Sequence, residues 1–181
     1  MANTAPTKVV TGLVRFSYVH VFEPTAVAEG SSDKKYNISI IIPKRDKATL
    51  KKIEAAIDAA KELGMLTKWG NKMPKNLRTP LRDGDLERDD ECYANSMFLS
   101  AKSSSKPGIV DENLNEIISK DEFYSGCYGR ASLNFYPFDV NGSRGIACGL
   151  NNLQKLKDGE RLDGGFSSAA DDFGDDDDDL D

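Results

Sequence analysis

The residues best suited to chemistry in this chain are cations and aromatic rings that occur close together. Between Lys34 and Arg82 there are 13 Lys or Arg residues and only four acidic ones, a surplus of nine positive charges. Trp69, the only tryptophan, lies in this segment between Lys68 and Lys72. An unpaired nucleic acid strand needs this combination, because cations neutralise phosphates and each base stacked on a ring contributes roughly 1–3 kcal/mol. Two roles are open to Trp69: a stacking platform, or a plug for the end of a barrel.

A second candidate surface is the strand expected over 128–136. Alternation along it separates an apolar, core-facing side from a half-polar side. The half-polar side consists of Tyr128, Arg130, Asn134 and Tyr136. It is either a binding face or a sheet face whose tyrosines merely meet water. The nucleic acid contacts that we predict from both regions and from neighbouring cations are Arg15, Lys34, Lys35, Tyr36, Trp69, Lys72, Lys75, Arg78, Arg82, Lys102, Lys106, Tyr128, Arg130, Tyr136 and Arg144.

Catalytic signals are weak by comparison. His20 is the only histidine and has apolar neighbours, so a Ser-His-Asp or Cys-His centre has little support. No phosphate-binding or dinucleotide-binding glycine motif is present, and we expect neither an enzyme nor a bound cofactor or metal. The alternative from the enzyme class is a Mg²⁺-dependent nuclease or resolvase, since carboxylates are clustered between 83 and 90. Its candidate ligands are Asp83, Asp85, Glu87 and Asp89. The competing interpretation is a solvated loop whose charges orient nearby cations.

The acidic residues are concentrated at the C-terminus. Residues 171–181 contain eight aspartates and no cation, which leaves 22 of the 30 acidic side chains for the rest of the chain, against all 24 basic ones. Such a like-charged segment is expected to be disordered and to compete with a polyanion for the basic surface. It can also dock partner proteins or serve for solubility alone. The predicted partner-binding residues are Asp171, Asp172, Phe173, Asp175, Asp176, Asp177, Asp178, Asp179, Leu180 and Asp181. A further alternative is an adaptor that acts through this tail only.

Length and composition predict one domain in the cytoplasm. The chain has 181 residues, of which 39% are hydrophobic and 30% are charged. No apolar run approaches the roughly 20 residues of a membrane helix, and the first residues do not resemble a signal peptide. The three cysteines form no CxxC pair, so we expect reduced, mostly buried thiols.

The elements that must position these residues are short strands around one helix. The helix is expected over Asp46–Leu63, with Asp46 as its N-cap and Gly64 as its end. A long irregular segment, 64–91, follows it. Strands are expected over Val9–Tyr18, Tyr36–Ile42, Tyr93–Ala101, Tyr128–Tyr136 and Arg144–Leu150. In the first strand, Val10, Val14, Phe16 and Tyr18 are expected to share one face. In the second, Tyr36, Ile38, Ile40 and Ile42 are expected to share one face. Asn141-Gly142 indicates a tight turn between the last two. This is a mainly β, barrel-like composition, with residues 1–165 as the domain and 166–181 as the tail.

Several sequence strings resemble a family of single-stranded DNA-binding proteins of bacteriophages and prophages. They are VTGLVRFSYVHVFEP (10–24), IIPK (41–44), TPLRDGD (79–85), AKS (101–103) with KPGIVD (106–111), YSGCY (124–128) and GIACGLNN (145–152). The resemblance implies an OB-fold that coats single-stranded DNA during phage replication, recombination and repair in the host bacterial cytoplasm. It also implies an acidic tail for phage or host replication proteins. Individual DNA contacts are not carried over from the family, and the oligomeric state is left open.

Overall fold

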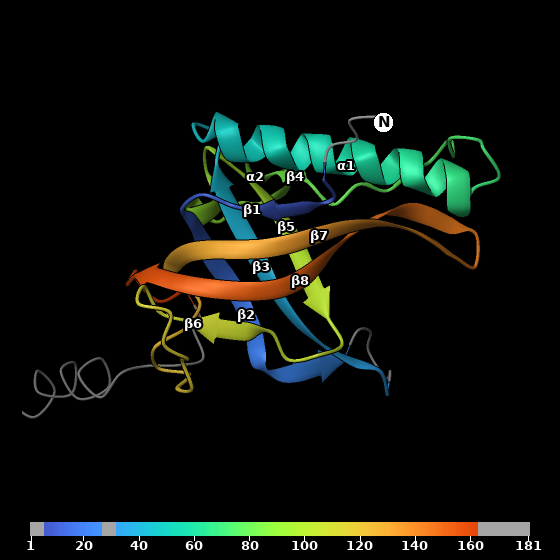
Figure 1. Ribbon diagram of the computed structural model, residues 1–181. Coiled ribbons are helices and arrows are strands. Elements are labelled where there is room, and N and C mark those ends of the chain that lie inside the picture. Colours follow the sequence, from blue (N-terminus) through green and yellow to red (C-terminus); the bar gives the residue numbers. More distant parts are fainter. Residues whose placement is uncertain (1–5, 27–31, 163–181) are drawn as a thin grey trace, which may run out of the picture.

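A barrel of β-strands beneath one long helix dominates the computed structural model, which describes residues 6–26 and 32–162 (Figure 1). The predicted mainly β fold with one main helix is confirmed. The strands are β1 (Lys8–Val10), β2 (Val14–Ala26), β3 (Lys34–Pro43), β4 (Arg82–Asp83), β5 (Ser96–Ser103), β6 (Gly108–Val110), β7 (Tyr128–Val140) and β8 (Ser143–Lys157). The helical segments are α1 (Lys47–Thr67), α2 (Gly84–Glu87) and the 3₁₀ turn η1 (Glu91–Tyr93). Within the described residues, no helix is apolar over enough length to cross a lipid bilayer.

Five strands form the barrel by pairing in a ring. β2 pairs with β3, and β3 with β5, in antiparallel register. β5 meets β8 in parallel, β8 pairs with β7, and β7 returns to β2. A three-stranded meander closed in this way by a hairpin is the OB-fold arrangement. β1 extends the ring beside β7, and β6 extends it beside β8.

The barrel interior is filled by alternate residues of these strands. The isoleucines predicted to share one face of β3 are each at most 1% exposed: Ile38, Ile40 and Ile42. Ile41 lies on the opposite side of β3 but is also buried, because Tyr93 and Phe98 pack with it in a second cluster. Ser39 and Tyr93 share a hydroxyl hydrogen bond of 3.1 Å beside them. The segment before β5 is therefore anchored onto the outer side of β3.

The first predicted strand, Val9–Tyr18, is wrong in two respects: the structure interrupts it, and Tyr18 faces outward. The chain leaves β1 at Val10 and begins β2 at Val14, and the β2–β3 register shifts between Ser17 and His20. Tyr18 has a φ of 46° at this bulge. As a result Tyr18 is 51% exposed, whereas strict alternation would bury it with Phe16. A bulge adds one unpaired residue and so turns the following side chains.

The helix begins as predicted but ends later. The Asp46 Oδ1 accepts a hydrogen bond of 3.1 Å from the Thr49 amide, so Asp46 is the N-cap. Gly64 does not end α1, which continues to Thr67. A Cβ built at Gly64 would lie 2.6 Å from the Trp69 ring, so this glycine serves close packing inside the helix. Thus the chain returns tightly against α1 before it enters the long segment toward β4.

The predicted hairpin is confirmed and is longer than expected. β7 and β8 pair from Val140–Ser143 back to Tyr128–Lys157, across Asn141 and Gly142. These two residues have φ values of 51° and 85°, the positive range that a two-residue hairpin turn requires. In Figure 1 the hairpin extends from the barrel below the C-terminal part of α1. The strand expected over Tyr93–Ala101 is β5, shifted to Ser96–Ser103.

Candidate nucleic-acid interface

A groove runs over the outer face of β3 and β5. It consists of two adjoining hollows of about 470 and 550 Å³, which share Lys35, Arg88, Ser100 and Lys102. β3 and β5 are the second and third strands of the barrel, the face with which OB-folds bind oligonucleotides. We call this surface the groove, and its charged and aromatic lining is Tyr18, His20, Lys35, Arg78, Arg82, Glu87, Arg88, Phe98, Lys102, Tyr136 and Phe138.

Strand pairing positions the cations of the groove. Lys35 and Lys102 come from β3 and β5, whose inward-facing residues fill the core, so their own side chains lie on the outer side. Arg78 is held by a β-bridge to Gly145, in which the Ile146 amide donates to the Arg78 carbonyl at 2.7 Å. The irregular segment after α1 is thereby attached to β8 at the groove margin.

Five of the residues predicted from sequence meet in one hollow of the groove. They are Lys35, Arg78, Arg82, Lys102 and Tyr136. Glu87 is the acidic residue in the lining of this hollow, and its Oε1 is bound to Arg82 Nη1 at 2.9 Å. The excess of positive charge suits a phosphate backbone.

Aromatic rings accompany the cations. Tyr136 is 39% exposed, and its ring lies over Gly149, where a Cβ would approach Tyr136 Cε1 to 3.4 Å. Burial raises the pKa of Tyr136, so its hydroxyl stays neutral near pH 7. Tyr18, which the β2 bulge turns outward, contributes a second accessible ring to the adjoining hollow. Both rings present surfaces on which a base can stack.

Arg88 occupies the junction of the two hollows and was not predicted. Its guanidinium carbon lies 5.8 Å from the Tyr18 ring centroid, 5.4 Å from Tyr93 and 5.1 Å from Phe98. Arg88 is the only cation among the acidic residues 83–91, a signal that could have distinguished it. Tyr18, in contrast, had no such signal, since its alternation pointed to the core.

The acidic segment that we considered as a nuclease centre has a different role. Lys44 Nζ lies 2.8 Å from Asp83 Oδ1 and 2.8 Å from Asp85 Oδ2. The hydrogen bond from Lys44, followed by one from the Asn95 amide, lowers the pKa of Asp85. In the described part of the chain no three His, Cys, Asp or Glu residues are arranged to hold a metal ion. Asp83 and Asp85 bind Lys44, and Glu87 binds Arg82, contacts of the kind that the competing interpretation expected.

Arg15 and Tyr128 lie beyond the Tyr18 end of the groove. A further hollow, which shares Tyr18 and His20 with the groove, is lined by Arg15 and Arg161. Arg15 Nε donates to the Gly126 carbonyl at 3.1 Å, and its Nη2 donates to the Glu160 carbonyl at 2.9 Å. Its guanidinium carbon lies 5.2 Å from the centroid of the Tyr128 ring. Arg15 is therefore braced beside the Tyr128 ring, next to a hollow whose lining also includes Asp90, Glu91 and Glu160.

The prediction of Trp69 as a stacking platform is wrong. Its side chain is 4% exposed and belongs to the main core cluster. The indole Nε1 donates to the Phe138 carbonyl at 3.2 Å, which satisfies its one polar group. Because Gly64 and neighbouring core residues cover the ring, no base can reach its face. Trp69 is instead a core residue packed between α1 and the β7–β8 hairpin.

Other predicted contacts lie outside the groove. Arg130 Nε donates to the Thr11 carbonyl at 3.1 Å on the β1 side of β7. Arg144 pairs with Asp139 at 3.1 Å near the hairpin turn. Lys106 Nζ lies 5.6 Å from the Phe22 ring centroid. The remaining residues absent from the groove lining are Lys34 and Tyr36 on β3, and Lys72 and Lys75 in the segment after α1.

The remaining sequence predictions concern the cysteines and the C-terminal tail. Cys127 and Cys148 are buried free thiols as expected, and Cys92 is half-buried. Burial raises the pKa of Cys127 to about 11 and also raises that of Cys148. The predicted partner-binding tail lies outside the described residues.

Comparison with known proteins agrees with this geometry. Residues 7–181 match the family described as "Enterobacter phage Enc34, ssDNA-binding protein". Protein p50 of Acyrthosiphon pisum secondary endosymbiont phage 1 is 34% identical over 178 residues, which cover 93% of each chain.

Solved structures establish the fold independently. The single-stranded DNA-binding protein of bacteriophage Enc34, solved in complex with ssDNA, superposes with a TM-score of 0.76 at 24% identity, covering 87% of this chain and 90% of that one. Gp2.5, a single-stranded DNA-binding protein of bacteriophage T7, gives a TM-score of 0.63 at 13% identity, covering 93% of each chain. These are binding proteins and not enzymes. The chain therefore belongs to the family of phage single-stranded DNA-binding proteins represented by that of Enterobacter phage Enc34.

Proposed function

We propose that this chain binds single-stranded DNA along the groove, without sequence preference and without catalysis. The observation that carries the proposal is the meeting of five cations with exposed rings in one continuous hollow surface: Lys35, Arg78, Arg82, Arg88 and Lys102 beside Tyr18 and Tyr136. Cations on phosphates and rings on bases use parts that all nucleotides share, so the surface tolerates any sequence. Family membership supports the same conclusion.

The biological role that we propose is coating and protection of single strands in phage replication, recombination and repair. Such strands occur in the host bacterial cytoplasm. The acidic tail, residues 166–181 of the proposed domain division, would compete with DNA for the groove and contact phage or host proteins. Charge complementarity supports the competition, because residues 171–181 carry eight aspartates whereas the groove carries an excess of cations.

A titration of labelled poly(dT) by fluorescence anisotropy tests this proposal. The full chain and a version that ends at Ala170 are compared at several salt concentrations, with duplex DNA as the control. Single strands lower log K by about 0.7 per neutralised phosphate for each tenfold rise in salt, so about four contacts lose roughly three decades. We expect tighter binding by the shortened version, with the difference shrinking at high salt.

Three results would count against parts of the proposal. Affinity that does not change with salt would contradict phosphate neutralisation in the groove. An absolute requirement for one base sequence would contradict stacking as the main mode of base contact. If the version ending at Ala170 failed to bind, the adaptor hypothesis, in which the tail is the functional part, would be favoured instead.

A further inference from the structure

We propose that Arg88 is the central DNA-contacting residue of the groove and that Lys44, acting through Asp83 and Asp85, is the residue that positions it. This inference rests on the proposed binding of single-stranded DNA. It assigns a role to the acidic segment 83–91, because net charge alone does not explain why carboxylates lie next to a cationic groove. Carboxylates beside a phosphate-binding surface repel the ligand, so their presence here needs a structural reason.

The position of Arg88 is the first step of the argument. It lies where both hollows meet, so a strand that follows the groove must pass it. Its guanidinium carbon is within 6 Å of three ring centroids, the range of cation–π attraction. Among the described residues, no carboxylate forms an ion pair with Arg88, although Arg82 and Arg144 are both paired. Its guanidinium is thus available to a phosphate or base, and it lies beside the exposed Tyr18 ring.

The bracing of the segment is the second step. Asp83 caps α2 by accepting a hydrogen bond from the Asp85 amide at 3.0 Å, and both carboxylates bind Lys44. Asp85 Oδ1 also accepts a hydrogen bond of 2.9 Å from the Asn95 amide. α2 then ends at Arg88, whose amide donates to the Gly84 carbonyl at 3.1 Å. Lys44 therefore ties the end of β3 to the short helix that presents Arg88.

Strain at Tyr18 is the third step. A tyrosine with a φ of 46° is unfavourable, and such residues concentrate at binding and active sites. The bulge has an identifiable result, because it brings an exposed ring next to the Arg88 guanidinium. A base stacked on Tyr18 would lie beside a fixed cation. Tyr18 in one hollow and Arg88 at the junction of the two hollows therefore form one stacking point.

Anisotropy titration of a labelled dT oligonucleotide at low salt tests the role of Arg88. We expect Arg88→Ala to weaken binding roughly 5- to 30-fold, the equivalent of a desolvated cation–π contact of about 1–2 kcal/mol. Arg88→Lys should recover only part of the loss, since an ammonium has no planar fork. Equal affinity of Arg88→Ala and the original chain would overturn the assignment.

The Asp85→Asn variant distinguishes positioning of Arg88 from a general effect of net charge, because the two predict opposite changes in DNA affinity. Removing a negative charge near the groove strengthens DNA binding if only net charge matters. If Lys44 positions Arg88, the variant binds DNA more weakly, because its contact with Lys44 is weakened and Arg88 is no longer fixed. The Asn side chain can still accept the Asn95 amide, so the segment should remain folded. Tighter binding by this variant would overturn the positioning role.

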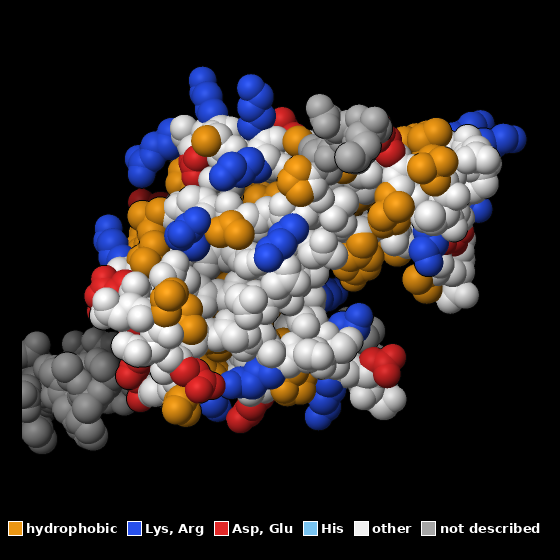
Figure 2. All heavy atoms as spheres, in the orientation of Figure 1, with side chains coloured by type: hydrophobic (Ala, Val, Ile, Leu, Met, Phe, Trp, Pro, Cys, Tyr) orange, Lys and Arg blue, Asp and Glu red, His pale blue; other side chains and the backbone are white. Residues whose placement is uncertain are grey.

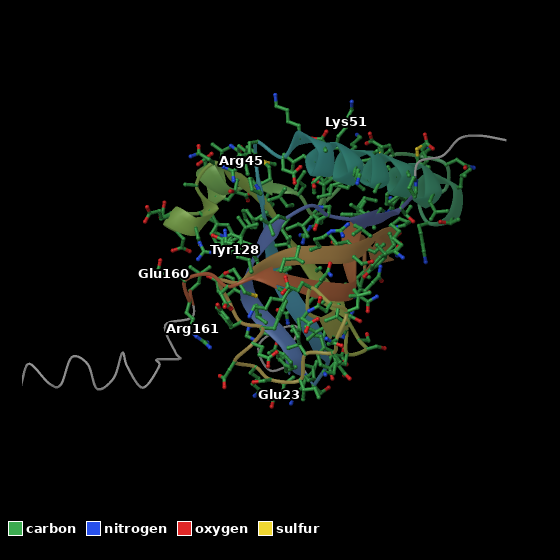
Figure 3. All side chains as sticks on the ribbon, turned by 60° about the vertical axis from the view of Figure 1, so that its left-hand side comes forward. Glu23, Arg45, Lys51, Tyr128, Glu160 and Arg161 are labelled. Atoms are coloured by element: carbon green, nitrogen blue, oxygen red, sulfur yellow. The ribbon has the colours of Figure 1, made fainter. Side chains whose placement is uncertain are left out.

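A double-mutant cycle tests whether Lys44 acts through Arg88. Lys44→Met should weaken binding in the original chain but cause no further loss in Arg88→Ala, whereas Lys44→Arg should restore binding. Lys51→Met, on the exposed side of α1, is the matched control for lost charge (Figure 3). Additive losses would show that Lys44 contacts DNA directly and would refute positioning. If the original chain does not bind the oligonucleotide at all, the proposed function itself fails. If the original chain binds and Arg88→Ala binds equally well, only the role of Arg88 fails.

Discussion

The groove and the outer side of α1 are both rich in cations, yet only the groove combines them with aromatic rings in a hollow. Figure 2 shows Lys and Arg side chains gathered over the N-terminal part of α1. The exposed lysines there are Lys47, Lys51 and Lys52. Lys51 points away from the barrel in Figure 3, and no aromatic ring contacts these lysines in the described residues. In the groove, similar charges line a hollow together with Tyr18, Tyr136 and Phe98. The comparison teaches that cation density alone identifies a basic segment, whereas cations that line a hollow together with aromatic rings identify a candidate binding site.

The largest effect is expected from Trp69, which belongs to neither surface. Trp69→Ala should lower the free energy of unfolding by roughly 3–5 kcal/mol, because it empties a buried site beside α1. Denaturant unfolding measures this loss. The dissociation constant for dT oligonucleotides, measured on folded protein, should remain unchanged. A selective loss of affinity without destabilisation would restore the stacking role.

Charge removal tests the comparison directly. Replacing Lys35, Arg78 and Lys102 by Gln should remove about three phosphate contacts and make the salt slope shallower by about 2, roughly a hundredfold in affinity at 0.1 M salt. Replacing Lys47, Lys51 and Lys52 by Gln is the matched control, with the same charge change. The control should leave the slope nearly unaltered. Equal effects of the two triple variants would contradict the distinction between the surfaces.

Loss of a ring should alter affinity without altering the salt slope. Tyr18→Ala is expected to weaken binding by about 1–3 kcal/mol, since it removes a stacking surface and no charge. Tyr18→Phe should bind nearly as well as the original chain. Tyr36→Ala, outside the groove lining, is the control. Anisotropy over a salt series measures both quantities, and a changed slope would contradict a pure stacking role.

The smallest effect is a change in thiol reactivity at the far end of the groove. Cys92 lines the hollow that also contains Arg15 and Tyr18, whereas Cys127 and Cys148 are buried. Burial, opposed by the charge of Arg15, raises the pKa of Cys92, so its thiolate forms mainly at alkaline pH. We expect maleimide at pH 8.5 to label Cys92 first, and dT oligonucleotides to slow this labelling. Unchanged labelling rates would show that DNA does not extend to this hollow.

The sequence predicted those features that local patterns determine. The period of β3 located Ile38 and Ile40 in the core, Asp46 marked the start of α1, and Asn141-Gly142 marked the turn. Each depends on side-chain spacing or on turn chemistry within a few residues. The mainly β barrel followed from the number of such strands.

The site was predicted only in part, because tertiary contacts decide the rest. Trp69 has the sequence context of an exposed ring, but Gly64 and Phe138 bring it into the core. Tyr18 has the spacing of a core residue, but the bulge turns it outward. Arg88 lies in an acidic segment, but the fold places it in the lining of the groove. No local pattern encodes the outcomes at Trp69 and Tyr18, and at Arg88 the only local signal is a single cation among acidic residues.

The groove lies across the point at which β5 and β8 close the barrel. β5 and β8 pair at one position, Lys102 with Gly149, and β2 and β7 pair at two, so the β5–β8 junction is the narrowest seam in the ring. The groove crosses that seam, with Lys35 and Lys102 on one side and Arg78 and Tyr136 on the other. A strand of DNA lying there would contact both sides of the β5–β8 junction and hold them together. We expect bound oligonucleotide to slow amide hydrogen exchange in β5 and β8 more than in α1, so that the ligand completes the closure of its own binding surface.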